Sequence, residues 1–313
     1  IGYPRPESIS LSLSSQKTYV GCSFKLKATV LPDDAYNNHS WSTSNPSVAA
    51  VDENGRVTLI AKGSADIKAT TDVGGLIASC IVTVEEPALS GEFSVGPADN
   101  CKEVRFSRGN LRYTPNIESW WFFDNQYNHG HSADQLSLFT WGYGNWSTSW
   151  NTKNFQSGNF TDWGTQIGDG KTWRTLSSQE WNYLFNSRTD ASTKVGYATV
   201  GGVNGFIILP DSFSDPMKNN GSGAFVPKST TGWTANVYTT GGNWEAMESA
   251  GAVFLPAAGD RDGSNVEHVG DSGLYWSSTA DYSAVLFYGD YVRHDYYINR
   301  SSGCSVRLIT ESK

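Results

Sequence analysis

The fold of the N-terminal part is decided by residues 41–57, which read WSTSNPSVAAVDENGRV. Two short runs rich in Trp, Val and Ala are each followed by turn residues, Ser-Asn-Pro after the first and Asp-Glu-Asn-Gly after the second. Asn-Gly is a pair that tight hairpin turns favour, because both residues tolerate a positive φ. This stretch therefore predicts short antiparallel strands and no helix.

The same alternation of short apolar runs and turn residues extends outward on both sides of this stretch. Gly63 and the pair Gly74-Gly75 interrupt it. A series of about seven strands in under about ninety residues is typical of a two-sheet sandwich. The expected strands cover residues 8–13, 24–30, a short segment around Trp41, 48–51, 57–61, 65–70 and 77–84.

Composition and charge limit the partners that the chain can bind. Hydrophobic residues make up 38% and charged residues 17% of the sequence, a mixture that favours strands joined by turns. The formal charge is -8, from 23 basic and 31 acidic residues, so we expect no nucleic-acid partner. No apolar window reaches about 18 residues and the start does not read as a signal peptide, so we expect a soluble chain whose leader has been removed.

The length of 313 residues allows two domains, each with its own core. A short stretch with Pro and Gly follows Glu86 and has the composition of a linker. We expect a first domain over residues 1–86, a linker over residues 87–91 and a second domain over residues 92–313.

The second domain is expected to open and close with strands that pair. Residues 104–107 and 305–309 have matching apolar patterns, and pairing them brings the two ends of the domain together. The apolar runs 206–209 and 252–255 are each followed by Pro and suit buried strands that end there.

Two helices are expected between these strands. Ser177 and Glu180 have capping-box spacing and predict the start of the first. The second runs from residue 243 to residue 250 and stops at Gly251. The apolar face of the first helix consists of Trp181, Leu184 and Phe185.

With so few helices, aromatic side chains must supply much of the core of the second domain. A place in the core is a better interpretation of these tryptophans than stacking against a sugar. They are Trp120, Trp121, Trp141, Trp163, Trp173, Trp181 and Trp276.

The four cysteines fall two and two across the expected boundary, and none has the spacing of a metal ligand. In an oxidising compartment, one disulfide within each domain is plausible. The alternative is that they are buried thiols that pack as small apolar groups. The candidates are Cys22 and Cys80 in the first domain and Cys101 and Cys304 in the second.

The first domain resembles a known family. Its motifs are VLPDDA at residues 30–35, WSTSNPSVA at 41–49, VDENGRV at 51–57 and AKG at 61–63. Together they resemble the bacterial immunoglobulin-like domain of group 2 over residues 7–84. The resemblance implies a spacer and presentation module of bacterial surface proteins, without an active site of its own.

The second half also contains a set of motifs. They are VRFSRGNL at 104–111, WRTLS at 173–177 followed by Glu180-Trp181, GAVFLPAAG at 251–259 with Arg261, YWSS at 275–278 and GCSVRL at 303–308. Together they resemble C-type-lectin-fold domains of surface proteins from gut Bacteroidetes. Within that fold they are similar to the variable proteins of diversity-generating retroelements, and more distantly to the formylglycine-generating enzymes.

Residues 277–303 form the candidate binding segment. It contains five of the 15 tyrosines of the chain, with Ser, Asp, Asn and Arg between them. Antibody combining sites favour this mixture, because Tyr offers a large contact area with few torsions to freeze and the short polar residues adapt their hydrogen bonds. If Val285 and Phe287 face the core, their neighbours face outward. The expected binding residues are Tyr282, Leu286, Tyr288, Asp290, Tyr291, Arg293, His294, Asp295, Tyr296, Tyr297, Asn299 and Ser301.

The same segment contains no Lys, Glu, Gln, Met or Trp. In the retroelement family that the second domain resembles, diversification replaces adenines at the first two positions of AAC codons. That process reaches most amino acids but none of these five, so their absence is what it would leave. The alternative is that these are ordinary polar loop residues of a hairpin.

Enzymatic chemistry is not expected. The formylglycine-generating relatives use a pair of their own cysteines, whereas Cys304 is the only cysteine after residue 101. The sequence has no Ser-His-Asp order, P-loop or dinucleotide fingerprint.

Two segments could hold a metal ion, and in each a loop is the preferred interpretation. Asp260 and Asp262 offer the oxygen ligands that calcium favours, but they miss the spacing of an EF-hand and suit a tight turn at Gly263. His129 and His131 lack a third ligand at a convincing distance. We therefore expect no cofactor, with calcium as the alternative.

Together these observations predict a mainly β chain: an Ig-like β-sandwich followed by an α+β head of C-type-lectin-like type, similar to the formylglycine-generating enzymes. We expect an extracellular or cell-surface protein whose head recognises an unknown glycan or protein on another cell or host surface. Attachment to a bacterial or phage surface would run through residues that precede Ile1. The alternatives are a structural subunit of a surface appendage and an enzyme of the formylglycine-generating type.

Overall fold

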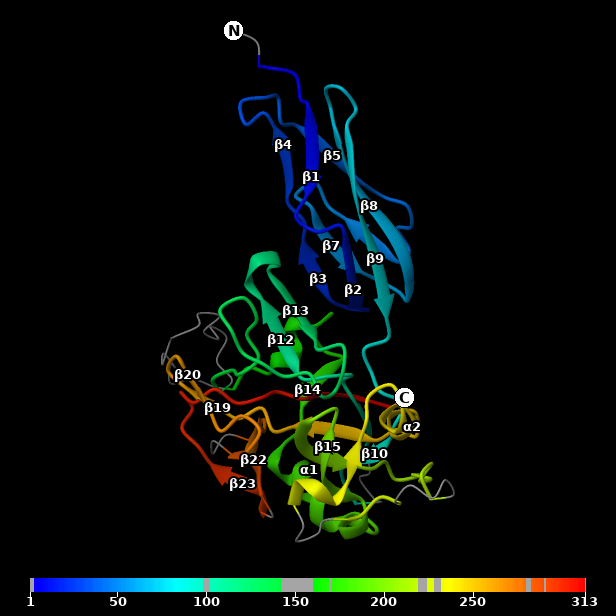
Figure 1. Cartoon of the computed structure of the whole chain (residues 1–313), viewed down its shortest axis with the longest axis vertical. Coiled ribbons are helices and arrows are strands. Elements are labelled where there is room, and N and C mark those ends of the chain that lie inside the picture. Colours follow the sequence, from blue (N-terminus) through cyan, green and yellow to red (C-terminus); the bar gives the residue numbers. More distant parts are fainter. Residues whose placement is uncertain are drawn as a thin grey trace. The chain divides into compact units, whose positions relative to one another are not determined.

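The structure is a computed structural model that describes residues 3–97, 102–141, 160–168, 170–218, 224–227, 232–279, 283–289 and 291–312. The chain divides into two compact units. The first contains Ile1–Pro87 with the segments Thr114–Trp121 and Ile167–Asp169, and the second contains the rest. Figure 1 shows that strands dominate and helices are few, which confirms the prediction of mainly β structure.

Residues up to Pro87 form a β-sandwich (Figure 1). One sheet has the strand order β2-β9-β8-β5, and a second has the order β3-β7-β6, with the pair β1-β4 beside them. The strands are β1 (Ser8–Leu11), β2 (Ser15–Tyr19), β3 (Ser23–Lys25), β4 (Ala28–Leu31), β5 (His39–Thr43), β6 (Ala49–Val51), β7 (Arg56–Leu59), β8 (Gly63–Thr71) and β9 (Ile77–Glu85).

Side chains that alternate along these strands build the core of the sandwich. Ile67 on β8 and Val82 on β9 are fully buried, while Ile81, next to Val82, points to solvent. The turn before β7 requires Gly55, whose φ is 77° and whose place a side chain could not take without overlapping the Trp41 ring. The motif at residues 41–57 thus fixes both the turn and the packing over it.

Three details of the sandwich differ from the sequence prediction. Strand β2 was not predicted, because SQKTY lacks an apolar alternation and its parallel pairing with β9 is a long-range contact. The expected strand 24–30 is two strands, β3 and β4, which pair with different partners. Gly63, expected as a break, is the first residue of β8, with a positive φ of 150° that residues with a side chain rarely adopt.

The expected disulfide between Cys22 and Cys80 is not formed in the structure, where both side chains are buried thiols. Cys80 lies inside the sandwich on β9, and burial, with Asp66 nearby, raises the pKa of its thiol to about 11. The second expected disulfide involves Cys101, which lies outside the described residues, while Cys304 is a buried thiol. For Cys22 and Cys80 the alternative of buried thiols is therefore the correct one.

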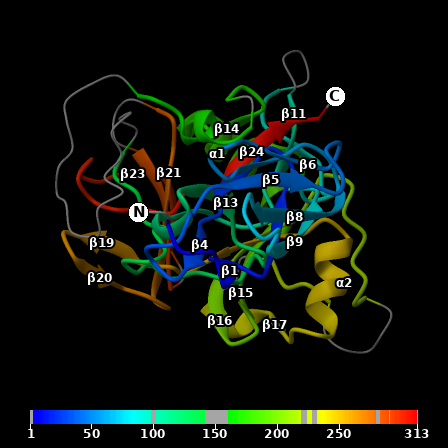
Figure 2. The same ribbon diagram turned by 90° about the horizontal axis from the view of Figure 1, so that it is seen from above.

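The remaining strands form several small sheets (Figures 1 and 2). Their orders are β10-β11-β24-β14, β17-β15-β16-β18 and β21-β22-β23, with the pairs β12-β13 and β19-β20. The strands are β10 (Phe93–Ser94), β11 (Glu103–Phe106), β12 (Leu111–Thr114), β13 (Ser119–Phe122), β14 (Trp173–Thr175), β15 (Val195–Val200), β16 (Val203–Ile208), β17 (Val237–Tyr238), β18 (Val253–Pro256), β19 (Asp260–Asp262), β20 (Asn265–Glu267), β21 (Ser272–Trp276), β22 (Ser283–Tyr288), β23 (Tyr291–Tyr297) and β24 (Leu308–Glu311).

The opening and closing strands pair as predicted. Strands β11 and β24 are antiparallel, with Phe106 opposite Ile309. On its other side β24 pairs with β14, so the last strand lies in the middle of its sheet. The two buried runs that end at Pro also pair with each other, as β16 and β18.

Both predicted helices are present. Helix α1 (Ser178–Asn182) starts at a complete capping box between Ser177 and Glu180 and continues as the π-helical turn η4 (Tyr183–Ser187). Helix α2 (Asn243–Ser249) ends before Gly251, whose φ is 91°. The short 3-10 turns are η2 (Pro115–Ile117), η3 (Trp163–Gln166), η5 (Ala191–Thr193) and η6 (Gly232–Ala235).

Aromatic rings fill the core of the second unit, as expected. Of the seven tryptophans named above, the five in this unit, Trp141, Trp163, Trp173, Trp181 and Trp276, are all buried, whereas Trp120 and Trp121 belong to a segment of the first unit. The central ring is Phe287 on β22, which stacks on Phe206 at a centroid distance of 5.6 Å and on Tyr275 at 5.8 Å. The edge of Trp233 meets the same ring at 6.3 Å. Strand β22 is therefore anchored from below by offset and edge-to-face aromatic contacts.

Replacing Phe287 by Ala should destabilise the second unit by about 3–5 kcal/mol, because the change leaves a cavity among rigid rings. We expect its unfolding temperature to fall by roughly 10 °C, measured by near-ultraviolet circular dichroism of the packed aromatics. The neighbouring change Tyr288→Ala is the control, since Tyr288 is 55% exposed and should alter stability by less than about 0.5 kcal/mol. Equal losses from both changes would contradict the assignment of the two faces.

The state of Cys22 and Cys80 can be read by alkylation without reductant. We expect iodoacetamide to label neither residue in the folded chain and both after unfolding in guanidinium chloride, because burial excludes the reagent and holds the Cys80 thiol protonated. Peptide mass spectrometry gives the result. Labelling that requires prior reduction of the unfolded chain would instead show a disulfide.

Candidate ligand-binding face

The candidate segment contains a β-hairpin. Strands β22 and β23 are antiparallel, with Tyr288 opposite Tyr291 and Leu286 opposite Arg293. Gly289 lies in the turn with a φ of 55°. Between Ala284 and Leu286 the register shifts by a β-bulge, where Ala284 and Val285 are both buried.

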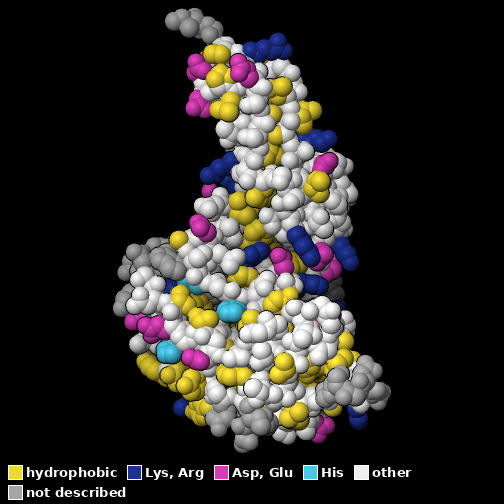
Figure 3. Space-filling model, in the orientation of Figure 1, with side chains coloured by type: hydrophobic (Ala, Val, Ile, Leu, Met, Phe, Trp, Pro, Cys, Tyr) yellow, Lys and Arg dark blue, Asp and Glu magenta, His cyan; other side chains and the backbone are white. Residues whose placement is uncertain are grey.

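One face of this hairpin consists of large exposed side chains. Tyr288, Tyr291 and Tyr297 are 55%, 48% and 66% exposed, and Arg293 and Asp295 lie on the same side of β23. In Figure 3, where hydrophobic side chains including Tyr are yellow, yellow side chains gather over this hairpin. We call these five residues the tyrosine face.

The two charges of the tyrosine face neutralise one another. Arg293 Nε donates to Asp295 Oδ1 at 2.9 Å, and this hydrogen bond lowers the pKa of Asp295. Because both side chains are half exposed, the pair contributes little to stability. It places a donor and an acceptor next to the tyrosine hydroxyls, which suits hydrogen bonding to a ligand.

Val285 and Phe287, which were expected to face the core, are buried. Of the predicted binding residues, Tyr288, Tyr291, Arg293, Asp295 and Tyr297 point to solvent, whereas Leu286, expected to face outward, is half-buried. On β23 the exposed and half-buried positions alternate, and His294 and Tyr296 occupy the half-buried side with Val292. After the strand, Asn299 is exposed and Ser301 half-buried, whereas Tyr282 and Asp290 lie outside the described residues.

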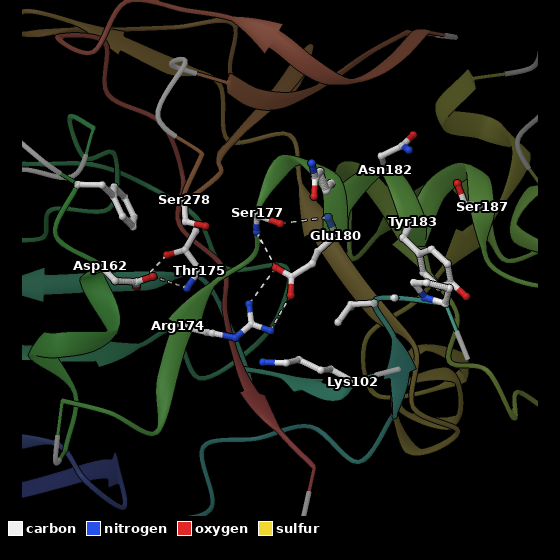
Figure 4. Close-up of a pocket in the computed structure, with 15 residues that line it drawn as sticks. Lys102, Asp162, Arg174, Thr175, Ser177, Glu180, Asn182, Tyr183, Ser187 and Ser278 are labelled. Carbon is white, nitrogen blue, oxygen red and sulfur yellow. Dashed lines mark hydrogen bonds and ion pairs between the residues drawn. The ribbon is translucent and has the colours of Figure 1, made fainter. Parts of the chain in front are cut away.

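Apart from the tyrosine face, a hollow of about 800 Å³ lies beside α1 (Figure 4). Arg174 projects from β14 toward Glu180, and Lys102 lies next to them in Figure 4. Sequence reasoning did not predict this hollow, because its lining residues come from segments far apart in the chain. Its polar lining includes Asp162, Ser177, Asn182, Tyr183, Ser187 and Ser278.

The acidic groups in this hollow have structural partners. Glu180 accepts from both terminal nitrogens of Arg174, at 2.7 and 2.8 Å, and from the backbone amide of Ser177. Burial alone would raise the pKa of Glu180, but these bonds outweigh it and lower the pKa below its usual value. Asp162 is held by the amide and hydroxyl of Thr175, and burial raises its pKa. These bonds hold β14 and the start of α1 in place.

The two candidate metal segments are also committed to structural contacts. Asp260 lies on β19, where its Oδ1 is 2.7 Å from Nδ1 of His268, and Gly263 makes the turn to β20. Nδ1 of His131 accepts from the amides of Ser137 and Leu138, and burial lowers the pKa of this histidine to about 3. Within the described ranges, no group of three or more His, Cys, Asp or Glu side chains could hold a metal ion.

No helix in the described part of the chain is long and apolar enough to cross a membrane.

Comparison with known proteins gives matches to short segments of the chain. A segment of 64 residues is 53% identical to an alpha-L-arabinofuranosidase of Bifidobacterium longum and covers 20% of this chain and 6% of that protein. A segment of 81 residues is 46% identical to a minor capsid protein of Enterobacteria phage T3, over 26% of this chain and 18% of that protein. The chain thus spans only a small part of these relatives.

Among solved structures, a mutant of intimin from EHEC O157:H7 matches with a TM-score of 0.23 and 23% identity, over 29% of this chain and 54% of that chain. BT4661, a SusE-like surface located polysaccharide binding protein of Bacteroides thetaiotaomicron, matches with a TM-score of 0.20 and 9% identity, over 42% and 32%. The family model of the bacterial Ig-like domain (group 2) matches residues 7–82. Together with the sandwich topology, this match identifies residues 7–82 as a bacterial Ig-like domain of group 2.

Proposed function

We propose that this chain is a surface-displayed binding protein in which the Ig-like domain carries a head of C-type-lectin type that recognises a glycan or protein without acting on it. The observation that carries the proposal is the two-sided hairpin of β22 and β23. Its inner face is anchored in the aromatic core, and its outer face is the tyrosine face. Extracellular or cell-surface display follows from the same proposal.

The chemistry of the tyrosine face suits binding better than catalysis. Three exposed tyrosines next to an Arg-Asp pair supply apolar contact area and hydrogen-bonding groups at a low cost in side-chain entropy. The partly buried acids Asp162 and Glu180 and the histidine His131 lie elsewhere and are bonded to backbone or arginine groups. This arrangement favours recognition on a fixed scaffold.

The family match over residues 7–82 and the short matching segments of other proteins support the role of the first domain as a carrier. Related segments occur in an arabinofuranosidase and in a phage capsid protein, two proteins whose names describe different activities. A module found beside such different partners acts as a spacer or display element. The ligand specificity of this chain therefore belongs to its head in this proposal.

We further propose that the head belongs with the retroelement-diversified variable proteins of Bacteroidetes. The support is the absence of Lys, Glu, Gln, Met and Trp from residues 277–303 together with the exposure of the tyrosine face. The remaining predicted positions, Tyr282, Leu286, Asp290, His294, Tyr296, Asn299 and Ser301, flank this face along the chain.

Changing Tyr288, Tyr291 and Tyr297 together to Ala tests the binding role. We expect capture on a glycan and protein array to weaken by about 30-fold or more, because exposed aromatic anchors dominate binding energies. The unfolding temperature should change by only roughly 2–4 °C, since the three rings are about half exposed or more.

In the matched control, Val237 and Val269 are replaced by Ala. These two valines are 60% and 50% exposed and lie outside the tyrosine face. Capture should persist in this control. Unchanged capture by the triple variant would overturn the role of the face. Light scattering tests the alternative of a structural subunit of an appendage. A particle mass that rises with concentration in the original chain, but not in the triple variant, would favour that alternative.

The DNA around the gene tests the diversification branch. We expect a reverse transcriptase gene and a near-copy of the 3′ end in which adenines stand at the codon positions of the tyrosine face. Sequencing of the locus gives the answer. A locus without either element would remove this branch and leave the binding role intact.

A further inference from the structure

A small pocket lies on the other side of β23 from the tyrosine face. Its volume is about 230 Å³. Val292 and His294 contribute one wall, and these two residues alternate along the strand with Tyr291, Arg293 and Asp295. Strand β23 therefore borders both the tyrosine face and this pocket.

The floor of the pocket is apolar and aromatic. Phe185 of η4 and Phe206 of β16 meet edge to face with centroids 5.7 Å apart, and both are buried. Val195 on β15 is buried beside them, and Val292 packs against the same core. A group that enters the pocket thus contacts rings and methyl groups.

Polar side chains occur only among the three remaining lining residues, Asn186, Ser192 and His294. Asn186 and Ser192 are exposed, and Nδ2 of Asn186 lies 3.4 Å from Nδ1 of His294. The pocket combines an apolar floor with hydrogen-bonding groups at its rim. A planar ring with one polar atom at its edge matches this distribution.

The volume limits the size of the group that fits. Sites for drug-sized molecules usually measure about 300–1,000 Å³, so this pocket is smaller than such a site. At about 30 Å³ per molecule in the liquid, roughly seven waters would fill it. A sugar ring carries several hydroxyls around its edge, more than the three polar side chains of the rim can bond, so some of them would lose their hydrogen bonds in the pocket.

We infer that this pocket receives an aromatic side chain with a polar atom at its ring edge, such as Trp, presented by a protein ligand that reaches around β23, the edge strand of its sheet, to the tyrosine face. The inference rests on the proposed function, because it names the class of ligand for that same head. The aromatic ring would insert between Phe185 and Val292, with its polar edge at Asn186, Ser192 or His294. In this inference the ligand is a protein and not a glycan.

The probe for this inference is N-acetyl-L-tryptophanamide, titrated into the full chain carrying ¹³C-labelled valine methyl groups. We expect the methyl signals of Val195 and Val292 to shift in a saturable way, with a dissociation constant in about the millimolar range for so small a fragment. Methyl α-glucoside and N-acetylglucosamine are titrated in parallel and should leave both signals in place.

Two variants place a large ring at the rim of the pocket, Ser192→Trp and Asn186→Trp. Each should weaken binding of the probe by about tenfold or more. The control is Thr193→Trp, which adds the same exposed ring one residue further along η5, away from the lining, and should change the affinity by less than about twofold.

Three results would overturn the inference: no shift of Val195 and Val292, a shift that both rim variants leave unchanged, or an equal response to the sugars. The outcome is separable from that of the proposed function. The triple tyrosine variant should bind the probe normally, because none of its changed residues lines the pocket. Capture on the array therefore tests the tyrosine face, and the methyl shifts of Val195 and Val292 test the pocket.

Discussion

The packing of Phe287 against Phe206 and Tyr275 is the contact on which the geometry of the head depends. Strand side chains alternate between two faces, so a ring fixed in the core also fixes the outward direction of the residues on either side. Gly273 on the neighbouring strand leaves the space that this ring needs, because a Cβ at that position would overlap with it. A slip of one residue along β22 would bury Tyr288 and expose Phe287.

Local patterns in the sequence were enough to predict the elements that rest on local chemistry. The capping box at Ser177, the glycine after α2 and the Asn-Gly turn each have a short-range signature, and each is present. Strand β2 was missed because its pairing with β9 joins residues 66 positions apart, such as Ser15 and Ile81, which no short window of sequence contains. The same limit applies to Cys22 and Cys80, whose sequence context is equally compatible with a thiol and a disulfide.

The site shows the same division. Alternation along β22 correctly predicted the inward Val285 and Phe287 and the outward Tyr288, but it carries no information about what covers the other side of β23. His294 therefore seemed equivalent to Arg293, although the structure places it beside Asn186 of η4. Both hollows combine residues from distant segments, so only the fold brings them together. Arg174 and Glu180 both belong to a motif quoted from the sequence. That motif indicated the fold, but it did not indicate that the two side chains pair or that they line a hollow.

The two sides of β23 place different demands on variation within residues 277–303. If the segment is diversified as proposed, changes at Tyr291, Arg293 and Asp295 alter contacts with solvent and should leave the core intact. Changes at Val285 or Phe287 would remove buried volume and cost several kcal/mol, so variation there would reduce the folded fraction. Val292 and His294 lie between these extremes, because they shape a pocket without filling the core. Variation at these two positions would alter which side chain the pocket accepts while the tyrosine face stays in place, so one strand could tune two contacts independently.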